Sequence, residues 1–322
     1  MFRIVKTDLG VVSIPEEALS HLSGIGYRID DVPCRSAQDI IDQAADADAL
    51  VVMTENVTRE VMEALPKLKV IARVGVGVDT IDVAAATELG ILVTNVPDAN
   101  FNEVATHALA LILDQLRRIT VFNSSMQKGE WAPSTIGAGM RRPSALSLGL
   151  VGFGRSAQRL TDLVRPLGFE VHVYARPKYA DSIIAMGGTP MSLDELFETS
   201  DIVSLHIPVT EETRGLIDRT RLSRMKTGAV LINVSRGGLV DEHALAERVQ
   251  AGHIAGAGFD VFEAEPAGIG SPFHGVDGIT LTPHVAYLSK EAAAEAASTA
   301  VSEIGRVFRN ERPINLVNCE AE

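Results

Sequence analysis

Three polar side chains stand directly after apolar runs of the sequence, and their types suit acid–base work on an acidic substrate. Arg236 lies in a Ser-Arg-Gly-Gly turn, Glu265 precedes Pro266, and His284 follows Pro283. A guanidinium binds a carboxylate through two parallel hydrogen bonds, an imidazole exchanges protons near neutral pH, and a nearby carboxylate favours the charged imidazole. Singly, each has a plain alternative: a surface cation, an exposed turn acid and a strand-end histidine that holds a loop carbonyl. Together they predict a substrate-binding arginine and a catalytic acid–base pair.

A glycine-rich turn adds the signature of a dinucleotide site. In "LGLVGFGRSAQRL" an apolar run meets Gly152, Gly154 and Ala157 before an amphipathic stretch begins. Glycines let the chain turn tightly and bring backbone N–H groups, with the N-terminus of the next helix, against a pyrophosphate. A plain strand–helix turn is the alternative. With this turn, the guanidinium, carboxylate and imidazole are what hydride transfer to a 2-oxoacid requires.

The end of the next predicted strand indicates which cofactor the turn would hold. An NAD site often places an acid there to bind the ribose hydroxyls, but "EVHVYARPKYA" has Ala175 at that point. Without the acid, a 2′-phosphate is not repelled, and Arg176 and Lys178 can pair with it. The segment therefore predicts a site that prefers NADP. The alternative is that both cations are solvated loop residues that happen to follow a strand.

Short apolar runs alternate with amphipathic segments along most of the chain, which is typical of parallel α/β sheets. The runs are "ALVVMT", "VIARVGVG", "ILVTNV", "LSLGLVGFG", "DIVSLHIP", "AVLINVS" and "ITLTPHV". Long helical patterns over 102–124 and 289–310 are expected to carry the chain between two domains and back. We expect two doubly wound, Rossmann-like or flavodoxin-like domains: a discontinuous one of residues 1–100 plus 288–322 for the substrate, and 101–287 for the dinucleotide.

Composition excludes several classes of function. The formal net charge of −13 repels nucleic acid and anionic membranes, so an anionic substrate must be bound by local cations. Cys34 and Cys319 show neither a disulfide framework nor metal-ligand spacing, which favours a reducing compartment, the cytoplasm. The N-terminus lacks a signal pattern and no apolar run is long enough to span a membrane. We therefore expect a protein with no metal, no nucleic-acid partner and no membrane segment.

The successive motifs resemble those of the D-isomer-specific 2-hydroxyacid dehydrogenase family over essentially the whole chain. They are "RVGVGVDTID", "NVPDAN", "GLVGFGRSA", "LHIPVTEETRGLI", "NVSRGGLVDEHAL", "GFDVFEAEP" and "LTPHVA", in the order that the family has them. The resemblance implies two similar α/β domains, a substrate domain made from both ends of the chain, a central dinucleotide domain and a homodimer formed around the central domain.

The resemblance also implies roles for single residues. His284 corresponds to the acid–base histidine, Glu265 to its partner and Arg236 to the substrate arginine, and the turn Val74, Gly75 and Val76 resembles a second carboxylate clamp unless it is simple turn geometry. The implied cofactor contacts are Arg155 and Ser156 at the pyrophosphate, His206, Ile207 and Pro208 beside the adenosine, Thr213 near the 2′-edge, and Val234 and Asp260 at the nicotinamide. For Asp260, capping of a loop is the alternative.

Different segments resemble different branches of the family. "YARPK" resembles NADP-preferring glyoxylate and hydroxypyruvate reductases, whereas "NVPDANFNEVATHALAL" and "PHVAYLS" resemble phosphoglycerate-dehydrogenase-like enzymes and C-terminal-binding-protein corepressors. Arg73 is a candidate to meet a substrate phosphate, but the chain stops at Glu322, so a long regulatory domain is not expected. Trp131 is expected to anchor packing in a loop, or else to reach a neighbouring subunit.

The leading prediction is a reductase of small 2-oxoacids, such as glyoxylate or hydroxypyruvate, that prefers NADP over NAD. The alternatives are an NAD enzyme of the phosphoglycerate dehydrogenase type and a dinucleotide-sensing binding protein of the corepressor type.

Overall fold

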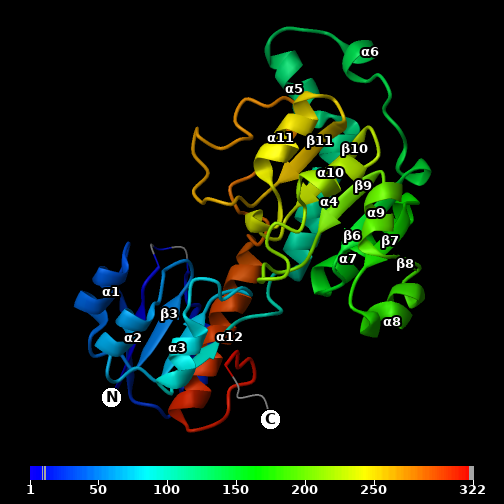
Figure 1. The fold of residues 1–322 in the computed structure, drawn as a ribbon. Helices are drawn as coiled ribbons and strands as arrows, with labels where there is room; N and C mark the ends of the chain where they lie inside the picture. The colour runs from blue at the N-terminus through cyan, green and yellow to red at the C-terminus, as the bar shows by residue number, and fades with distance from the viewer. Residues whose placement is uncertain (9, 11, 319–322) are drawn as a thin grey trace. The chain divides into compact units, whose positions relative to one another are not determined.

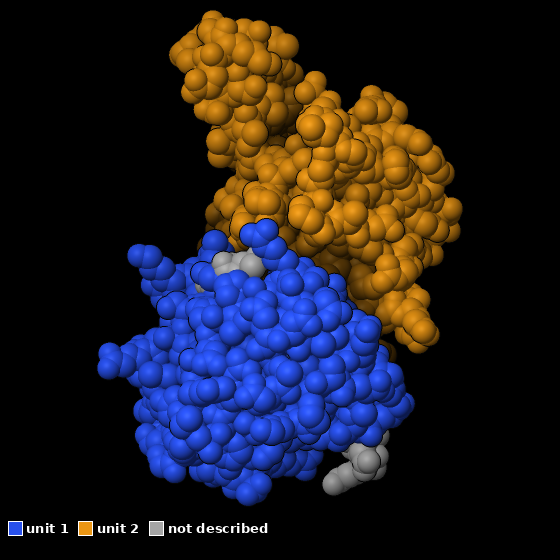
Figure 2. All heavy atoms as spheres, turned by 90° about the vertical axis from the view of Figure 1, so that its left-hand side faces the viewer, with its two compact units in different colours: residues 1–100, 288–322 blue, residues 101–287 orange. Residues whose placement is uncertain are grey.

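The computed structural model describes residues 1–8, 10 and 12–318, and Cys319 therefore lies outside the described residues. Two compact units are present, one made of Met1–Asn100 and Leu288–Glu322 and the other of Phe101–Tyr287. Figure 2 colours the two units separately. Each unit has its own parallel sheet with helices on both faces, so the chain is an α/β protein of two doubly wound sheets.

The sheet of the first unit has five parallel strands in the order β2-β1-β3-β4-β5. They are β1 (Phe2–Lys6), β2 (Tyr27–Asp31), β3 (Ala49–Val52), β4 (Val70–Arg73) and β5 (Leu92–Thr94). This is the flavodoxin-like order, in which the chain reverses direction between β1 and β3.

Helices cover the two faces of this sheet with separate cores. The elements are η1 (Glu16–Leu22), α1 (Ala37–Ala44), α2 (Arg59–Ala64), α3 (Val83–Glu88) and α12 (Lys290–Phe308). Buried side chains of α1, α2 and α3 form one core, and those of η1 and α12 form the other. Ser289 caps α12 by accepting a hydrogen bond from Ala292 N at 2.9 Å, as expected for a serine before an apolar helical pattern.

The C-terminal segment returns to the edge of the same sheet. Leu316 pairs with Thr94 in an antiparallel bridge, and Val317 N donates to Val93 O at 2.8 Å. The buried carboxylate of Glu303 accepts hydrogen bonds from the backbone N–H groups of Ile314 and Asn315. The two ends of the sequence therefore build one unit.

The sheet of the second unit has seven parallel strands in the order β12-β11-β10-β9-β6-β7-β8. They are β6 (Ser147–Val151), β7 (Glu170–Tyr174), β8 (Thr189–Pro190), β9 (Ile202–Leu205), β10 (Ala229–Asn233), β11 (Ile254–Phe259) and β12 (Ile279–Leu281). The strand order is that of a Rossmann fold, and the chain reverses direction between β6 and β9. Ligands of such sheets bind at the carboxyl ends of the strands next to this reversal.

Here too the helices form a layer on each face (Figure 1). Helices α4 (Phe101–Arg117) and α7 (Arg155–Val164) pack on one face, and α9 (Leu193–Thr199), α10 (Arg219–Arg224) and α11 (Glu242–Gln250) pack on the other. The central strands β6, β9 and β10 are buried on both sides, which is why their sequences read as continuous apolar runs. The remaining helices are α5 (Ile119–Gln127), α6 (Pro133–Ile136), α8 (Ala180–Ala185), η2 (Pro143–Ala145), η3 (Arg165–Leu167), η4 (Pro177–Tyr179) and η5 (Gly237–Leu239).

Two expectations about the start of this unit are wrong. The helix predicted over 102–124 is divided, because Arg118 has a left-handed backbone with φ of 52° between α4 and α5. Apolar periodicity continues through the break and therefore hides it. Trp131 does not anchor packing, since it is 81% exposed in the loop between α5 and α6.

In the part of the chain that the structure describes, no helix is both long and apolar enough to cross a lipid bilayer.

Candidate active site

The site is built from loops that follow strands of the second sheet, beginning with the pair Glu265 and His284. Glu265 comes after β11 and His284 after β12. The carboxylate Oε2 of Glu265 accepts a hydrogen bond from His284 Nδ1 at 2.6 Å. Its other oxygen, Oε1, accepts from Phe262 N at 2.8 Å. The structure therefore brings together two side chains that stand 19 positions apart in the sequence.

The charge state of Glu265 follows from these partners. Burial acts to raise the pKa of this carboxyl, but the hydrogen bonds from His284 and from Phe262 N–H, with the positive charge of Arg236, lower the pKa below its usual range. Glu265 is consequently a carboxylate that carries its negative charge next to the imidazole ring. The His284 side chain keeps 41% exposure, and Nε2 is the ring nitrogen that does not bond to Glu265.

Backbone contacts hold the arginine turn against the segment that carries Glu265. Gly237 follows Arg236, and a Cβ at position 237 would collide with the backbone of Phe262 and Glu263. Asn233, fully buried at the end of β10, donates from Nδ2 to Arg236 O at 2.9 Å. The Arg236 guanidinium itself donates to Ser235 O at 2.8 Å. Neither Asn233 nor Gly237 is a sequence-predicted site residue, although a polar residue ending an apolar run is a signal for Asn233.

Asp260 holds the loop on which His284 lies. It is fully buried, and its Oδ1 accepts hydrogen bonds from Thr282 Oγ1 at 2.6 Å and Val285 N at 2.9 Å. Its Oδ2 accepts from Ala286 N at 2.8 Å, and its backbone oxygen accepts from His284 N at 2.7 Å. His284 has a φ of 53°, a conformation that is costly for a residue with a side chain and persists where the surroundings impose it. These contacts match the loop-capping alternative for Asp260, and its contact with a nicotinamide stays a prediction.

A second tie connects this loop to α4. Nε2 of His107 lies 2.9 Å from Thr282 Oγ1 and 3.6 Å from Asp260 Oδ1. Since the Thr282 hydroxyl has Asp260 within donating distance, its lone pairs are available to His107. The long helix α4 is thereby joined by hydrogen bonding to the loop of the candidate acid–base residue.

The glycine turn lies at the reversal of strand order. Gly152 has a φ of 104°, and a Cβ there would lie 2.5 Å from His206 O, so only glycine fits between the ends of β6 and β9. Gly154 is the N-cap of the ten-residue helix α7, and a Cβ on it would meet nothing within 4 Å. No side chain caps the first turn of α7, and the space beside Gly154 is open. The turn therefore has room for an anionic group close to the backbone N–H groups at the start of this helix.

The residues predicted beside the pyrophosphate and the adenosine are joined by hydrogen bonds. Nδ1 of His206 lies 3.3 Å from Ser156 Oγ, and Nε2 lies 2.9 Å from Ser204 Oγ. Burial lowers the pKa of His206 to about 4, so the ring is neutral near pH 7. The Ser235 hydroxyl donates to Ile207 O, which connects the end of β9 to the arginine turn.

Other predicted cofactor residues occupy the same edge of the sheet. Arg155 and Pro208 are exposed, and Val234 is buried. The Thr213 hydroxyl donates to Pro208 O at 2.7 Å and so closes its own turn. Arg176 and Lys178 are exposed after β7, whose last residue, Tyr174, accepts a hydrogen bond from Gly152 N at 2.8 Å.

The predicted second clamp belongs to the first unit, after β4. Val74 and Gly75 are buried, Val76 is exposed, and Gly75 has a φ of 146°. The Arg73 guanidinium occupies the space beside the Gly75 Cα, where any side chain would collide with it. The N–H of Val74 donates to Val52 O at 2.8 Å and that of Gly75 to Arg73 O at 3.0 Å, so the turn offers a cation and the exposed backbone at Val76.

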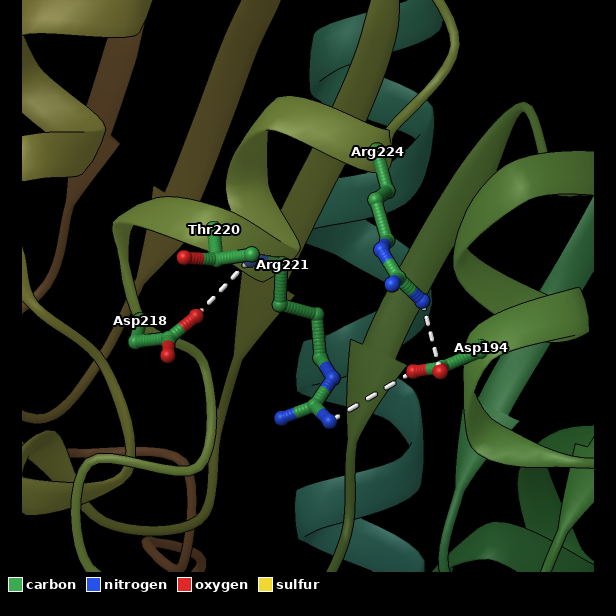
Figure 3. A pocket seen from close by; sticks show the side chains of 5 residues that line it. All are labelled: Asp194, Asp218, Thr220, Arg221 and Arg224. Atoms are coloured by element: carbon green, nitrogen blue, oxygen red, sulfur yellow. Dashed lines mark hydrogen bonds and ion pairs between the residues drawn. The ribbon is translucent and has the colours of Figure 1, made fainter.

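A small hollow elsewhere in the second unit shares no residue with this set (Figure 3). It measures about 100 Å³ and is lined by Asp194, Asp218, Thr220, Arg221 and Arg224. Asp194 pairs with Arg224 at 2.6 Å and with Arg221 at 3.5 Å, while Asp218 caps α10 through Arg221 N at 2.7 Å. Its charges are satisfied by one another, which is typical of a structural ion-pair cluster. Among the described residues no group of three or more His, Cys, Asp or Glu side chains is arranged to hold a metal ion.

Sequence relatives share most of this chain. A D-3-phosphoglycerate dehydrogenase of Mycobacterium leprae is 38% identical over 308 residues, which cover 93% of this chain and 57% of the relative. A glyoxylate reductase of Korarchaeum cryptofilum is 36% identical over 313 residues, covering 95% of this chain and 94% of the relative. The chain thus spans less than two thirds of the length of the phosphoglycerate dehydrogenase and nearly all of the glyoxylate reductase.

Solved structures have the same fold. The TT0316 protein of Thermus thermophilus superposes with a TM-score of 0.87 at 32% identity, covering 98% of this chain and 100% of that one. An acyclic imino acid reductase in complex with NADPH and D-Arg gives a TM-score of 0.86 at 25% identity, covering 98% and 100%. The model of the family "D-isomer specific 2-hydroxyacid dehydrogenase, NAD binding domain" matches residues 109–286, within the second unit. The chain therefore belongs to the family of NAD(P)-dependent, D-isomer specific 2-hydroxyacid dehydrogenases.

Proposed function

We propose that the protein reduces small 2-oxoacids, such as glyoxylate or hydroxypyruvate, to D-2-hydroxyacids with NADPH as its preferred cofactor. The observation that carries this proposal is the 2.6 Å contact between His284 and Glu265, with Arg236 close enough to influence the same carboxylate. Acid, base and carboxylate-binding groups are what the reduction of a 2-oxoacid requires from the protein.

The roles of the three residues follow from their hydrogen bonds. Because Glu265 accepts from Nδ1 of His284, Nε2 is the nitrogen that exchanges a proton with substrate. The negative charge of Glu265 stabilises the imidazolium, which donates its proton to the carbonyl oxygen. Arg236 holds the substrate carboxylate and polarises the adjacent carbonyl. A bound nicotinamide dinucleotide supplies the hydride.

The residues of the second unit suit such a cofactor. The open backbone at Gly154 would accommodate a pyrophosphate against the first turn of α7, and the neutral His206 with Ile207 would border the adenosine. Ala175 presents no carboxylate to a 2′-phosphate, and Arg176 and Lys178 offer it two positive charges. Related solved structures hold either cofactor, NADPH in the imino acid reductase and NAD in a D-lactate dehydrogenase of Aquifex aeolicus, so the choice of NADPH rests on these three residues.

In the first unit, the turn Val74, Gly75 and Val76 is proposed to bind an acidic substrate through backbone N–H. Val74 N donates to Val52 O at 2.8 Å and Gly75 N to Arg73 O at 3.0 Å, so the N–H of Val76 is the group proposed to meet the substrate. The φ of Gly75 excludes most other residues, and the burial of Val74 and Gly75 limits the motion of the turn. The match to a glyoxylate reductase over nearly its full length supports a small unphosphorylated substrate.

Steady-state kinetics of the purified protein test this function. Glyoxylate and hydroxypyruvate are to be reduced with NADPH and with NADH, by the wild type and by His284→Ala and Arg236→Lys. We expect a higher kcat/KM with NADPH, a loss of roughly 10²- to 10⁴-fold in kcat for His284→Ala, and a raised KM for Arg236→Lys. Absence of turnover across a wide panel of 2-oxoacids with both cofactors contradicts the proposal.

A second candidate substrate is a phosphorylated 2-oxoacid. The Arg73 guanidinium beside Gly75 adds a positive charge to the clamp turn, and the phosphoglycerate dehydrogenase relatives support this choice. Arg73→Gln distinguishes the two candidates. If Arg73 binds the substrate phosphate, this variant should reduce kcat/KM for phosphohydroxypyruvate more than kcat/KM for hydroxypyruvate. If Arg73 does not bind it, the ratio of these two kcat/KM values should stay unchanged.

The protein is also proposed to form a homodimer through residues 119–136, which comprise α5, α6 and the loop between them. This segment stands out from the rest of its unit (Figures 1 and 2). Four large apolar side chains are exposed on it, namely Ile119, Val121, Met126 and Trp131. An exposed apolar surface of this kind favours association with another protein chain. Light scattering should give twice the mass of one chain for the wild type and a lower mass for Ile119→Glu with Trp131→Ser, and a monomeric wild type contradicts the proposal.

A further inference from the structure

Tyr179, at the end of η4, lies beneath both cations of the proposed 2′-phosphate site. Arg176 Cζ is 5.9 Å from the centroid of its ring, and Lys178 Nζ is 5.1 Å from it. Both distances lie within the range in which a cation is attracted to an aromatic ring. The two cations are exposed whereas the ring is half-buried, so the ring is the part of this segment that is fixed.

The ring is fixed through the glycine turn. Its centroid is 6.3 Å from that of Phe153, with the ring planes at 71°, an edge-on arrangement that aromatic pairs prefer. Phe153 is 2% exposed and stands between Gly152 and Gly154. Tyr179 therefore connects the glycine turn, proposed to hold the pyrophosphate, to the two cations that are proposed to bind the 2′-phosphate.

This connection matters because long, exposed cationic side chains lose conformational freedom when they bind. Lys and Arg side chains are among those that lose most rotamer entropy, and holding them near their bound conformation reduces that loss. We propose that Tyr179 is a specificity-determining positioning residue, which holds Arg176 and Lys178 ready for the 2′-phosphate of NADP.

The inference rests on the proposed NADP preference and adds a residue that composition and spacing did not single out. It requires the face of the ring and not the hydroxyl group. Tyr179→Phe keeps the face and is the matched control, whereas Tyr179→Ala removes it. Tyr179→Leu keeps an apolar contact with Phe153 without an aromatic face, and replaces the alanine variant if that variant unfolds.

The experiment measures binding of two adenosine probes by calorimetry, without turnover. Adenosine 2′,5′-bisphosphate carries the 2′-phosphate, and adenosine 5′-monophosphate lacks it. We expect Tyr179→Ala to weaken binding of the bisphosphate by about five- to twentyfold, because both cations lose their contact with the ring. Binding of the monophosphate should stay unchanged. Tyr179→Phe should stay within about twofold of the wild type for both probes, and kcat/KM ratios for NADPH over NADH should change in parallel.

The results separate this inference from the proposed function. If the wild type binds the two probes equally, the NADP preference itself is wrong and the inference falls with it. If the wild type discriminates and Arg176→Ala abolishes the discrimination, but Tyr179→Ala keeps it, only the role of Tyr179 is wrong. Equal weakening of both probes by Tyr179→Ala also overturns the inference, because the ring then supports the fold of the site and not the phosphate contact.

Discussion

The Glu265 carboxylate and the His284 imidazole are joined by a 2.6 Å hydrogen bond although they belong to loops after different strands, β11 and β12. Two buried supports act on this pair. Asp260 accepts hydrogen bonds from the backbone N–H groups of His284, Val285 and Ala286, and the contact of Gly237 with Phe262 and Glu263 fixes the segment before Glu265. The pair is therefore held by buried parts of the fold.

Replacing Glu265 by Gln should lower kcat by roughly 10²-fold, because the imidazolium loses its charged partner. The substitution should also change how the stability of the protein depends on pH. The pKa of Glu265 is lower in the folded protein than its usual value, so its contribution to stability is complete above the unfolded pKa and is lost as pH falls through the folded value. Thermal unfolding of wild type and Glu265→Gln from pH 7 to pH 3 should show a difference in Tm that shrinks on acidification. A difference that grows instead contradicts the direction of this pKa shift.

Replacing Gly237 by Ala should destabilise the protein by about 1–3 kcal/mol and reduce activity, because the added methyl group overlaps the backbone of Phe262 and Glu263. Gly238→Ala is the matched control. Its Cβ would lie 3.0 Å from Arg214 Nη1, the flexible end of a side chain that can move away. Urea unfolding measures both variants, and equal stability of the two would show that the backbone adapts at position 237.

Replacing Asp260 by Asn should cost about 1–3 kcal/mol, because an amide nitrogen would face the N–H groups that this carboxylate now accepts. The loop of His284 should loosen, and kcat should fall even where cofactor binding persists. Asp277→Asn, in the exposed segment before β12, makes the same chemical change without these contacts and should match the wild type. If Asp260→Asn retains full stability and loses only cofactor affinity, its carboxylate acts on the nicotinamide and not on the loop.

Replacing His206 by Asn should make stability less dependent on acid pH. Burial lowers the folded pKa of His206 from 6.5 to about 4, so the unfolded chain binds more protons between these values. The stability of the wild type should therefore fall as pH drops through this window, by up to roughly 3 kcal/mol from this group. The free energy of unfolding, measured with denaturant at pH 7, 5.5 and 4.5, should fall less on acidification for His206→Asn than for the wild type. Equal falls would mean that the ring titrates in the same way in the folded and the unfolded protein.

The sequence by itself determined the α/β class, the two parallel sheets and the loops that carry polar groups. Parallel strands buried on both faces leave apolar runs that can be read directly, and their carboxyl ends meet at one edge. Arg236, Glu265 and His284 stand out for that reason, since each follows such a run.

Only the tertiary structure decided which partners these residues have. The hydrogen bonds of Asp260 reach residues 22 to 26 positions further on, and the break at Arg118 interrupts a periodicity that continues on both sides of it. Tyr179 reads as an ordinary aromatic residue until its ring is placed against Phe153 and two cations. Periodicity reports which face of an element is buried, whereas hydrogen bonds, steric contacts and exposure depend on groups that come together only when the chain folds.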